Sequence, residues 1–355
     1  MDNVLQQWVA LSLGGERLSD EDALSILRSN GPDILSLVEA AGQVRRHYFG
    51  RKVRLHQIHN IQNGLCPEDC GYCGQAKGSQ QPLKRYLIKP DEEILAEARA
   101  AKDRGVFRYC MVASGRGPNE VQTEQLCRVV RRITDEVGIR TCLSVGLVDE
   151  VQAHRFKEAG LDRLNHNLNT SETHTPQVVT THTFSDRMKT LRAAERAGLS
   201  TCSGMIAGMG ETDRDILEVA LTLREMKVPS IPINFLVPIE GNRLYASGQL
   251  TPERCLRILC LFRFLNPSAE VRVGGGREGH LRGMQGLALY PANSIFVEGY
   301  LVTRGDGFDA VRAMVEDAGF ELEGESAGGA CCTSGIRFRI DGDTNIMRPE
   351  TVVRN

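Results

Sequence analysis

The sequence predicts a protein of the α/β class whose main domain is a (β/α)8 barrel, with helices before it and an appendage after it. From about residue 53 onward, short stretches rich in β-branched residues alternate with longer amphipathic stretches. Most of the longer stretches begin with an acidic or capping residue, and several end at glycine, as helices do. Eight such strands separated by helices are typical of a closed, TIM-type parallel barrel, whose functional groups lie at the carboxyl ends of its strands.

The first 50 residues are expected to form helices ahead of the barrel. Ser19 is a suitable N-cap within "LSDEDALSILRSN", and "PDILSLVEAAGQVRRHYFG" has apolar residues at helical spacing before Gly50. We therefore predict an N-terminal helical segment over residues 1–50, arranged as a lid or collar on the barrel.

The barrel itself is predicted to occupy residues 51–321. Its expected strands are, in order, "VRLHQIHN" (53–60), "RYCMVAS" (108–114), "IRTCLSVG" (139–146), "DRLNHNL" (162–168), "STCSGMIAG" (200–208), "SIPINFLV" (230–237), "EVRVGG" (270–275) and "SIFVEGYLV" (294–302). The expected helices between them are "PDEEILAEARAAKDRG", "TEQLCRVVRRITDEVG", "DEVQAHRFKEAG", "SDRMKTLRAAERAG", "DRDILEVALTLREMK" and "PERCLRILCLFRFL". Residues 322–355 are rich in small side chains, so we expect a C-terminal tail that is partly flexible.

Composition restricts the class of function. The chain has 355 residues, with 43 Lys and Arg against 45 Asp and Glu, and its net charge is −2. This scattered and balanced charge predicts neither a nucleic-acid surface nor a nucleic-acid partner. The N-terminus lacks the pattern of a signal peptide, and no stretch reaches the roughly 20 apolar residues of a membrane span. We therefore expect a cytoplasmic protein, whose eleven cysteines serve metal binding, catalysis or packing and not disulfides.

Three cysteines lie close together in "NGLCPEDCGYCGQAKG", at Cys66, Cys70 and Cys73. Thiolates are soft, charged ligands that suit iron, and a cubane iron–sulfur cluster needs four ligands. Three cysteines would leave one iron open to a non-protein ligand, as catalytic zinc sites keep one position open. A zinc site completed by His56 or His59 is the alternative. Unligated core cysteines are disfavoured, because the flanking residues are polar and rich in Gly and Pro.

A second set of cysteines is predicted inside the barrel, where apolar side chains are usual. The alternation of side chains along the strands turns Cys110, Cys142, Cys202 and Arg272 inward. Any one of these cysteines could be an ordinary core residue. A buried arginine needs a partner, however, and an anionic cluster with thiolate ligands would provide one.

A run of amides, "NHNLNTS", follows in the fourth predicted strand. Alternation places Asn165, Asn167 and Asn169 on one face. Amides donate and accept hydrogen bonds, which suits a urea-like ring and ribose hydroxyls, although a solvated strand edge would have the same composition.

The motif CxxxCxxC after the first strand of a predicted barrel resembles the radical S-adenosylmethionine (SAM) superfamily, and the fuller "CPEDCGYC" resembles its biotin synthase family. The resemblance covers residues 20 to 320 approximately. It implies that Cys66, Cys70 and Cys73 bind a [4Fe-4S] cluster, whose open iron chelates SAM. The stretches "YCMVASGRGP", "TCLSVG", "TCSGMIAGMGET" and "VRVGGGRE" match the ligands of a [2Fe-2S] cluster, here Cys110, Cys142, Cys202 and Arg272.

The resemblance also implies contacts to the two small molecules. The positions matched to SAM contacts are Tyr72, Ala113, Asn167, Asn169, Ile206 and Val237. The positions matched to contacts with dethiobiotin are Asn165, Asn167, Asn234 and Thr303. Many relatives carry Asp where this chain has Asn169; because an amide still bonds ribose hydroxyls, we expect altered strength and unaltered function.

The activity that the resemblance implies is sulfur insertion into dethiobiotin to form biotin. The [4Fe-4S] cluster would cleave SAM to a 5′-deoxyadenosyl radical and the [2Fe-2S] cluster would donate the sulfur, with Cys66, Cys70, Cys73 and Arg272 as catalytic residues. Implied partners are a flavodoxin- or ferredoxin-type electron donor, the iron–sulfur assembly machinery and a second copy in a homodimer.

Two other functions stay open at this point. A different radical SAM enzyme, such as a hydrogenase-maturase-like or thiazole-pathway-like protein, would need the first three cysteines and not the second set. An iron–sulfur carrier would not need the amide run. The adjacent Cys331 and Cys332 in the tail match no part of the family pattern; they could bind iron, transfer sulfur or have no function.

Overall fold

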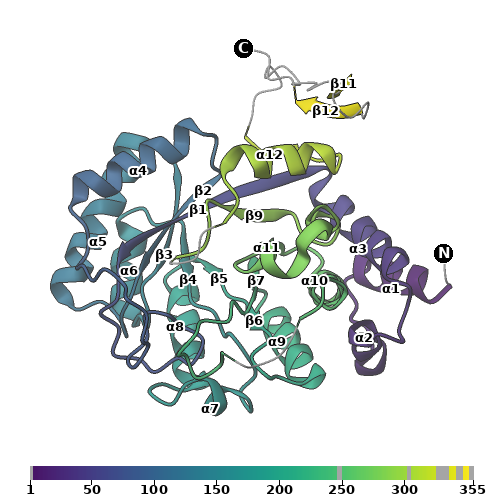
Figure 1. Ribbon diagram of the computed structural model, residues 1–355. Coiled ribbons are helices and arrows are strands. Elements are labelled where there is room, and N and C mark those ends of the chain that lie inside the picture. The colour runs from purple at the N-terminus through teal and green to yellow at the C-terminus, as the bar shows by residue number, and fades with distance from the viewer. Residues whose placement is uncertain (1–2, 246–249, 302–304, 325–335, 341–346, 352–355) are drawn as a thin grey trace. The chain divides into compact units, whose positions relative to one another are not determined.

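The computed structural model describes residues 3–245, 250–301, 305–324, 336–340 and 347–351 (Figure 1). The chain divides into two compact units, residues 1–324 and 325–355. In the second unit, β11 (Ile336–Ile340) pairs antiparallel with β12 (Met347–Thr351). Cys331 and Cys332, in the predicted tail, lie outside the described residues.

The first unit is built on a closed parallel barrel, which confirms the predicted fold class. Its strands are β1 (Lys52–Gln62), β2 (Arg108–Ala113), β3 (Arg140–Ser144), β4 (Arg163–Asn165), β5 (Ser200–Cys202), β6 (Met205–Ala207), β7 (Ser230–Phe235), β8 (Glu270–Val273) and β9 (Ser294–Val297). Each pairs in parallel with the next, β5 and β6 share one position beside β7, and β9 returns to β1 to close the barrel. The short β10 (Glu321–Leu322) adds to the start of β1.

Helices surround this barrel (Figure 1). They are α4 (Asp91–Asp103), α5 (Glu120–Arg132), α6 (Glu150–Glu158), α7 (Thr175–Val178), α8 (Phe184–Arg196), α9 (Asp213–Glu225), α10 (Pro252–Leu265), α11 (Arg277–Leu281) and α12 (Phe308–Asp317). A π-helical turn, η1 (Ile133–Val137), extends α5, and a 3-10 helix, η2 (Arg282–Leu289), extends α11. Capping boxes begin α5, α6, α8 and α9, as the acidic and polar residues at these positions indicate.

The N-terminal helices cover the outside of the barrel at α9 and α10. They are α1 (Asn3–Leu13), α2 (Asp20–Leu27), which Ser19 caps as predicted, and α3 (Ile34–Phe49). Because α10 lies between these helices and the barrel, most of its side chains are buried, including Cys255 and Cys260. None of the described residues before β1 lines the large cavity of the barrel, so this segment is a collar and not a lid.

The strands end earlier than the sequence predicts at two places that shape the cavity. The stretch 200–208 is two short strands, because the chain breaks at Ser203 and Gly204. A Cβ on Gly204 would lie 1.8 Å from the carbonyl oxygen of Pro232, so only glycine fits there. The strand predicted over 162–168 ends at Asn165. Asn169 then adopts a positive φ of 70°, a conformation that asparagine tolerates better than most residues.

Candidate active site

A cavity of about 280 Å³ opens at the carboxyl ends of the barrel strands. Both groups of predicted cysteines line it: Cys66, Cys70, Cys73, Cys110, Cys142 and Cys202. The other predicted site residues that line it are Arg272, Tyr72, Ala113, Ile206, Val237, Asn165, Asn167, Asn169 and Asn234. Thr303 lies outside the described residues. The structure thus brings together side chains from eight strands, β1 to β8, or the segments that follow them.

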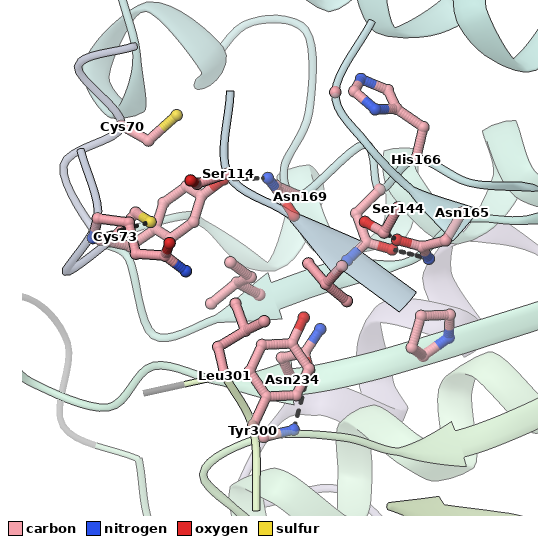
Figure 2. Close-up of a pocket in the computed structure, with 18 of the residues that line it drawn as sticks. Cys70, Cys73, Ser114, Ser144, Asn165, His166, Asn169, Asn234, Tyr300 and Leu301 are labelled. Atoms are coloured by element: carbon pink, nitrogen blue, oxygen red, sulfur yellow. Dashed lines mark hydrogen bonds between the residues drawn. The ribbon is translucent and has the colours of Figure 1, made fainter. Parts of the chain in front are cut away.

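The loop that carries the first three cysteines lies between β1 and α4. Figure 2 shows Cys70 and Cys73 on one side of the cavity, with Asn169 between them and the barrel strands. The amide of Cys73 donates to the carbonyl of Cys70 over 3.0 Å, which closes a tight turn between the two thiols. Burial raises the pKa of the Cys73 thiol to about 12 and also raises the pKa values of Cys66 and Cys70. A metal must therefore displace protons from these thiols when it binds.

Two carboxylates within the cysteine motif fasten this loop to residues 180–182. The carboxylate of Asp69 accepts hydrogen bonds from the amides of Thr180 (2.9 Å) and Thr181 (3.2 Å). The Glu68 carboxylate bonds the Thr181 hydroxyl (2.5 Å), His182 and the Arg116 guanidinium (3.0 Å). Burial raises the pKa of Glu68, but the bonds from Thr181, His182 and Arg116 outweigh it and keep that pKa below its ordinary value.

His182 connects Glu68 to the amide side of the cavity. Burial and the nearby Arg187 lower the pKa of His182, so its imidazole is neutral. Its hydrogen bonds assign the proton to Nδ1, which faces Glu68, because Nε2 accepts from Arg187 over 2.6 Å. Arg187 also donates to the carbonyl of Asn167 over 2.7 Å. The chain Glu68–His182–Arg187 therefore joins the cysteine loop to the backbone of the amide run.

The sequence did not single out Glu68, His182 or Arg187 as site residues. Glu68 lies inside the cysteine motif, and this position was the only available signal. The pairing with His182 spans 114 residues, and no local pattern indicates it.

The second group of cysteines is more deeply buried and lies on β2, β3 and β5. Cys110 on β2 and Cys142 on β3 are direct neighbours in the sheet register, and Cys202 ends β5. All three are at most 6% exposed. The hydrogen bond between Cys110 and Cys142 lowers the pKa of Cys110, whereas that bond and burial raise the pKa of Cys142. The Asn165 amide donates to the Cys202 sulfur over 3.2 Å, and the Arg272 Nη1 atom lies 3.7 Å from it.

The structure gives Arg272 a partner that the sequence argument did not foresee. Its Nη2 atom forms a buried ion pair with Glu270, two residues earlier on β8. A buried arginine at this position therefore does not by itself require an anionic cluster.

Neither histidine of the zinc alternative reaches the cysteine loop. His56 contacts Glu270 and Arg272 below the cavity, and His59 contacts Tyr109 and the Lys89 ammonium. In the part of the chain that the structure describes, no three His, Cys, Asp or Glu side chains converge on one metal ion. A polynuclear cluster does not need that convergence, because its thiolates bind different irons.

The three amides line the cavity, although Asn167 and Asn169 follow the end of β4 and do not continue it as a strand. The side-chain amide of Asn165 donates to the side-chain oxygen of Asn167 over 3.2 Å. The side-chain amide of Asn169 donates to the Tyr72 hydroxyl over 2.6 Å (Figure 2). Asn234 is held by backbone groups, since its oxygen accepts from the Gly275 amide over 2.9 Å. These amides face the cavity and are not a solvated strand edge.

Comparison with known proteins identifies the family. The radical SAM superfamily matches residues 61–223, and the Biotin and Thiamin Synthesis associated domain matches residues 232–321. The biotin synthase of Acaryochloris marina is 61% identical over 338 residues, which cover 95% of this chain and 98% of that protein. The chain belongs to the biotin synthase family. The biotin synthase of Magnetococcus marinus is 51% identical over 312 residues, 88% of this chain and 97% of that protein.

Membership of the biotin synthase family makes the chain a radical SAM enzyme of the sulfur-inserting transferase class. Solved structures at lower identity show the same barrel. Methylornithine synthase (PylB) has a TM-score of 0.77 at 20% identity, over 89% of this chain and 97% of that one. The FeFe-hydrogenase maturase HydG from Carboxydothermus hydrogenoformans has a TM-score of 0.76 at 18% identity, over 91% and 80%. Among the described residues, no helix has the length and apolar character needed to cross a bilayer.

Proposed function

We propose that this chain converts dethiobiotin to biotin by sulfur insertion, with SAM and two iron–sulfur clusters in the one cavity. The observation that carries the proposal is the placement of two separate groups of three cysteines on the same cavity, with amides between them. A radical SAM enzyme without a second cluster would need only the first group. An iron–sulfur carrier would not need a cavity lined by amides.

The residues present fit both clusters in their chemistry. Cys66, Cys70 and Cys73 would hold the [4Fe-4S] cluster, because three thiols on one short loop leave one iron for SAM. Cys110, Cys142, Cys202 and Arg272 would hold the [2Fe-2S] cluster. When bound, the two clusters supply the electron that cleaves SAM and the sulfur that is inserted.

The protein residues orient the small molecules and exclude water. Tyr72, Ala113, Asn167, Asn169, Ile206 and Val237 would contact SAM, and Asn165, Asn167, Asn234 and Thr303 would contact dethiobiotin. The side chains of Ile206 and Val237 are apolar, and the cavity around them lies inside the barrel. A reactive carbon radical needs the next reactant within bonding distance and no competing water, which an enclosed site provides.

The partners and organisation proposed for the chain follow from the same function. An electron donor of the flavodoxin or ferredoxin type would reduce the SAM-binding cluster, and the iron–sulfur assembly machinery would load both clusters. We also propose a cytoplasmic homodimer, with residues 1–50 as a helical segment, 51–321 as the barrel and 322–355 as a tail.

The test is anaerobic reconstitution of the full chain with iron and sulfide, followed by incubation with SAM, dithionite and dethiobiotin. Mass spectrometry should detect both 5′-deoxyadenosine and biotin. Absence of both products would overturn the proposal. Formation of 5′-deoxyadenosine without biotin would instead indicate a radical SAM enzyme that acts on another substrate.

A further inference from the structure

A single buried carboxylate lies below the inner cysteines, surrounded by cationic side chains. Glu270 begins β8, two residues before Arg272, so both side chains point into the barrel. Each is 2% exposed. A carboxylate this deep is costly unless it is fully paired, so its partners define what it does.

The two oxygens of Glu270 contact four basic side chains. Oε1 forms the ion pair with Nη2 of Arg272 and accepts from Nε2 of His56 over 2.9 Å. Oε2 lies 3.2 Å from Nη1 of Arg54, and Nη1 of Arg163 bridges both oxygens, at 3.4 Å from Oε2 and 3.5 Å from Oε1. Three guanidinium groups from three strands therefore share one carboxylate.

We propose that Glu270 is a positioning residue for Arg272: it holds one terminal nitrogen of the guanidinium so that the other faces the inner cysteines. The inference rests on the proposed function, because the group that Arg272 would meet there is the second cluster. It concerns a residue outside both predicted ligand sets.

The contacts of Arg272 support these different roles for its two terminal nitrogens. Nη2 is engaged on the far side from the cavity, by Glu270 and by the Ser230 hydroxyl at 2.9 Å. Nη1 is the terminal nitrogen that approaches the Cys202 sulfur, at 3.7 Å. Because a guanidinium is planar and rigid, fixing one terminal nitrogen fixes the direction of the other. The Phe296 ring, 5.1 Å from the guanidinium carbon, packs against its face and limits its rotation.

Ser230 links the same carboxylate to the cysteine. Its hydroxyl donates to Oε1 of Glu270 over 3.4 Å and lies 3.6 Å from the Cys202 sulfur. Glu270 thus acts on two of the four predicted ligands of the second cluster, on Arg272 directly and on Cys202 through Ser230.

Two unsatisfied polar atoms mark the same region. Within the described residues, Nε of Arg272 and Nδ1 of His56 are buried without a hydrogen-bond partner. Nε2 of His56 lies 2.9 Å from Oε1 of Glu270, so the imidazole contributes one more hydrogen bond to the carboxylate.

A carboxylate is needed at this position because the guanidinium groups around it repel one another. Arg54 has a second acidic partner, Glu323, at 2.8 Å. Arg163 contacts Glu270 and the Ser200 hydroxyl, the latter at 3.3 Å. Removing the charge of Glu270 would leave Arg163 and Arg272 as buried cations with no carboxylate between them, and repulsion would turn Arg272 away from its present direction.

The test uses the full chain, reconstituted anaerobically with both clusters, and compares two variants with one control. Glu270→Asp keeps the charge but withdraws the carboxylate by one methylene group. Glu270→Gln keeps the length and removes the charge. Glu323→Gln is the matched control, because it removes a carboxylate from the same arginine network without touching Arg272.

The measurement is the rate at which an iron chelator removes the second cluster, together with Mössbauer spectra, which distinguish the two cluster types. Loss of an outer-shell partner of a metal ligand typically costs about 10- to 100-fold in metal affinity, so we expect second-cluster loss to be faster by about that factor in both Glu270 variants. The spectrum of the second cluster should also change in both. The SAM-binding cluster and the Glu323→Gln protein should match the wild type.

Three results would overturn the inference. They are wild-type spectra and loss rates in Glu270→Asp, the same defect in Glu323→Gln as in Glu270→Gln, and an equal effect on both clusters. If Glu270→Gln does not fold, Glu270→Asp decides the question alone, since it retains the charge. Failure of the proposed function is visible separately, because the wild-type chain would then hold no second cluster.

Discussion

Replacing Glu68 with alanine should loosen the cysteine loop, and the cost can be worked out from its contacts. The variant leaves the Nδ1 proton of His182 without an acceptor, and His182 is a buried side chain. A buried donor that loses its partner costs about 1–3 kcal/mol. The Arg116 side chain is 51% exposed, so its ion pair with Glu68 adds only about 0–1 kcal/mol. We therefore expect the free energy of unfolding to fall by about 2 kcal/mol, mostly through His182.

The assay is urea unfolding of the anaerobically reconstituted protein, with SAM binding measured by equilibrium dialysis. SAM affinity should fall as well, because the chain through His182 and Arg187 holds the backbone of Asn167. Arg116→Gln is the control, since it removes only the exposed partner of Glu68. If Glu68→Ala costs no more stability than Arg116→Gln and leaves SAM affinity unchanged, the reasoning about the His182 connection is refuted.

Three further predictions concern other parts of the molecule. Cys202→Ala should remove the second cluster and biotin formation but leave SAM cleavage, and persistence of both second cluster and biotin would contradict the ligand assignment. Gly204→Ala should lower the free energy of unfolding by about 1–3 kcal/mol or more, because its Cβ would lie 1.8 Å from a backbone oxygen of β7; an unchanged urea midpoint would show that the break between β5 and β6 tolerates a side chain. Burial and Lys89 lower the pKa of His59 from 6.5 to about 4, so the unfolded chain binds more protons below pH 6.5. The stability that neutral His59 contributes is present above about pH 6.5 and is lost as the pH falls to about 4. The urea midpoint of the cluster-free protein should therefore fall more steeply over this pH range in the wild type than in His59→Gln.

The barrel could be predicted because each of its elements carries a local signal. Periodicity identifies strands and helices, and residues such as Ser19 mark where a helix begins. The ends of the strands were less predictable. The break at Gly204 depends on a carbonyl from the neighbouring strand, and the end of β4 at Asn165 depends on a backbone turn that the polar sequence does not distinguish from a strand.

The candidate site was predictable where its residues belong to motifs and unpredictable where they act through distant partners. The six cysteines were found by spacing and alternation, and the structure brings them to one cavity. The sequence did not indicate Glu270, although it lies two residues from Arg272, because its ion pairs are with arginines on the distant strands β1 and β4. A sequence argument that considers one buried charge at a time overlooks the charge that pairs with it.

The attachment of Asp69 and Glu68 to residues 180–182 has a consequence for how iron reaches the protein. These hydrogen bonds form between parts of the polypeptide alone, so they hold the cysteine loop to residues 180–182 without any contribution from a metal. Small metal-binding domains often fold only when the metal binds, and the binding free energy then drives folding. Here hydrogen bonds within the polypeptide supply part of the free energy that orders the loop. We therefore expect the rate of cluster delivery to depend on access and thiol deprotonation more than on chain folding.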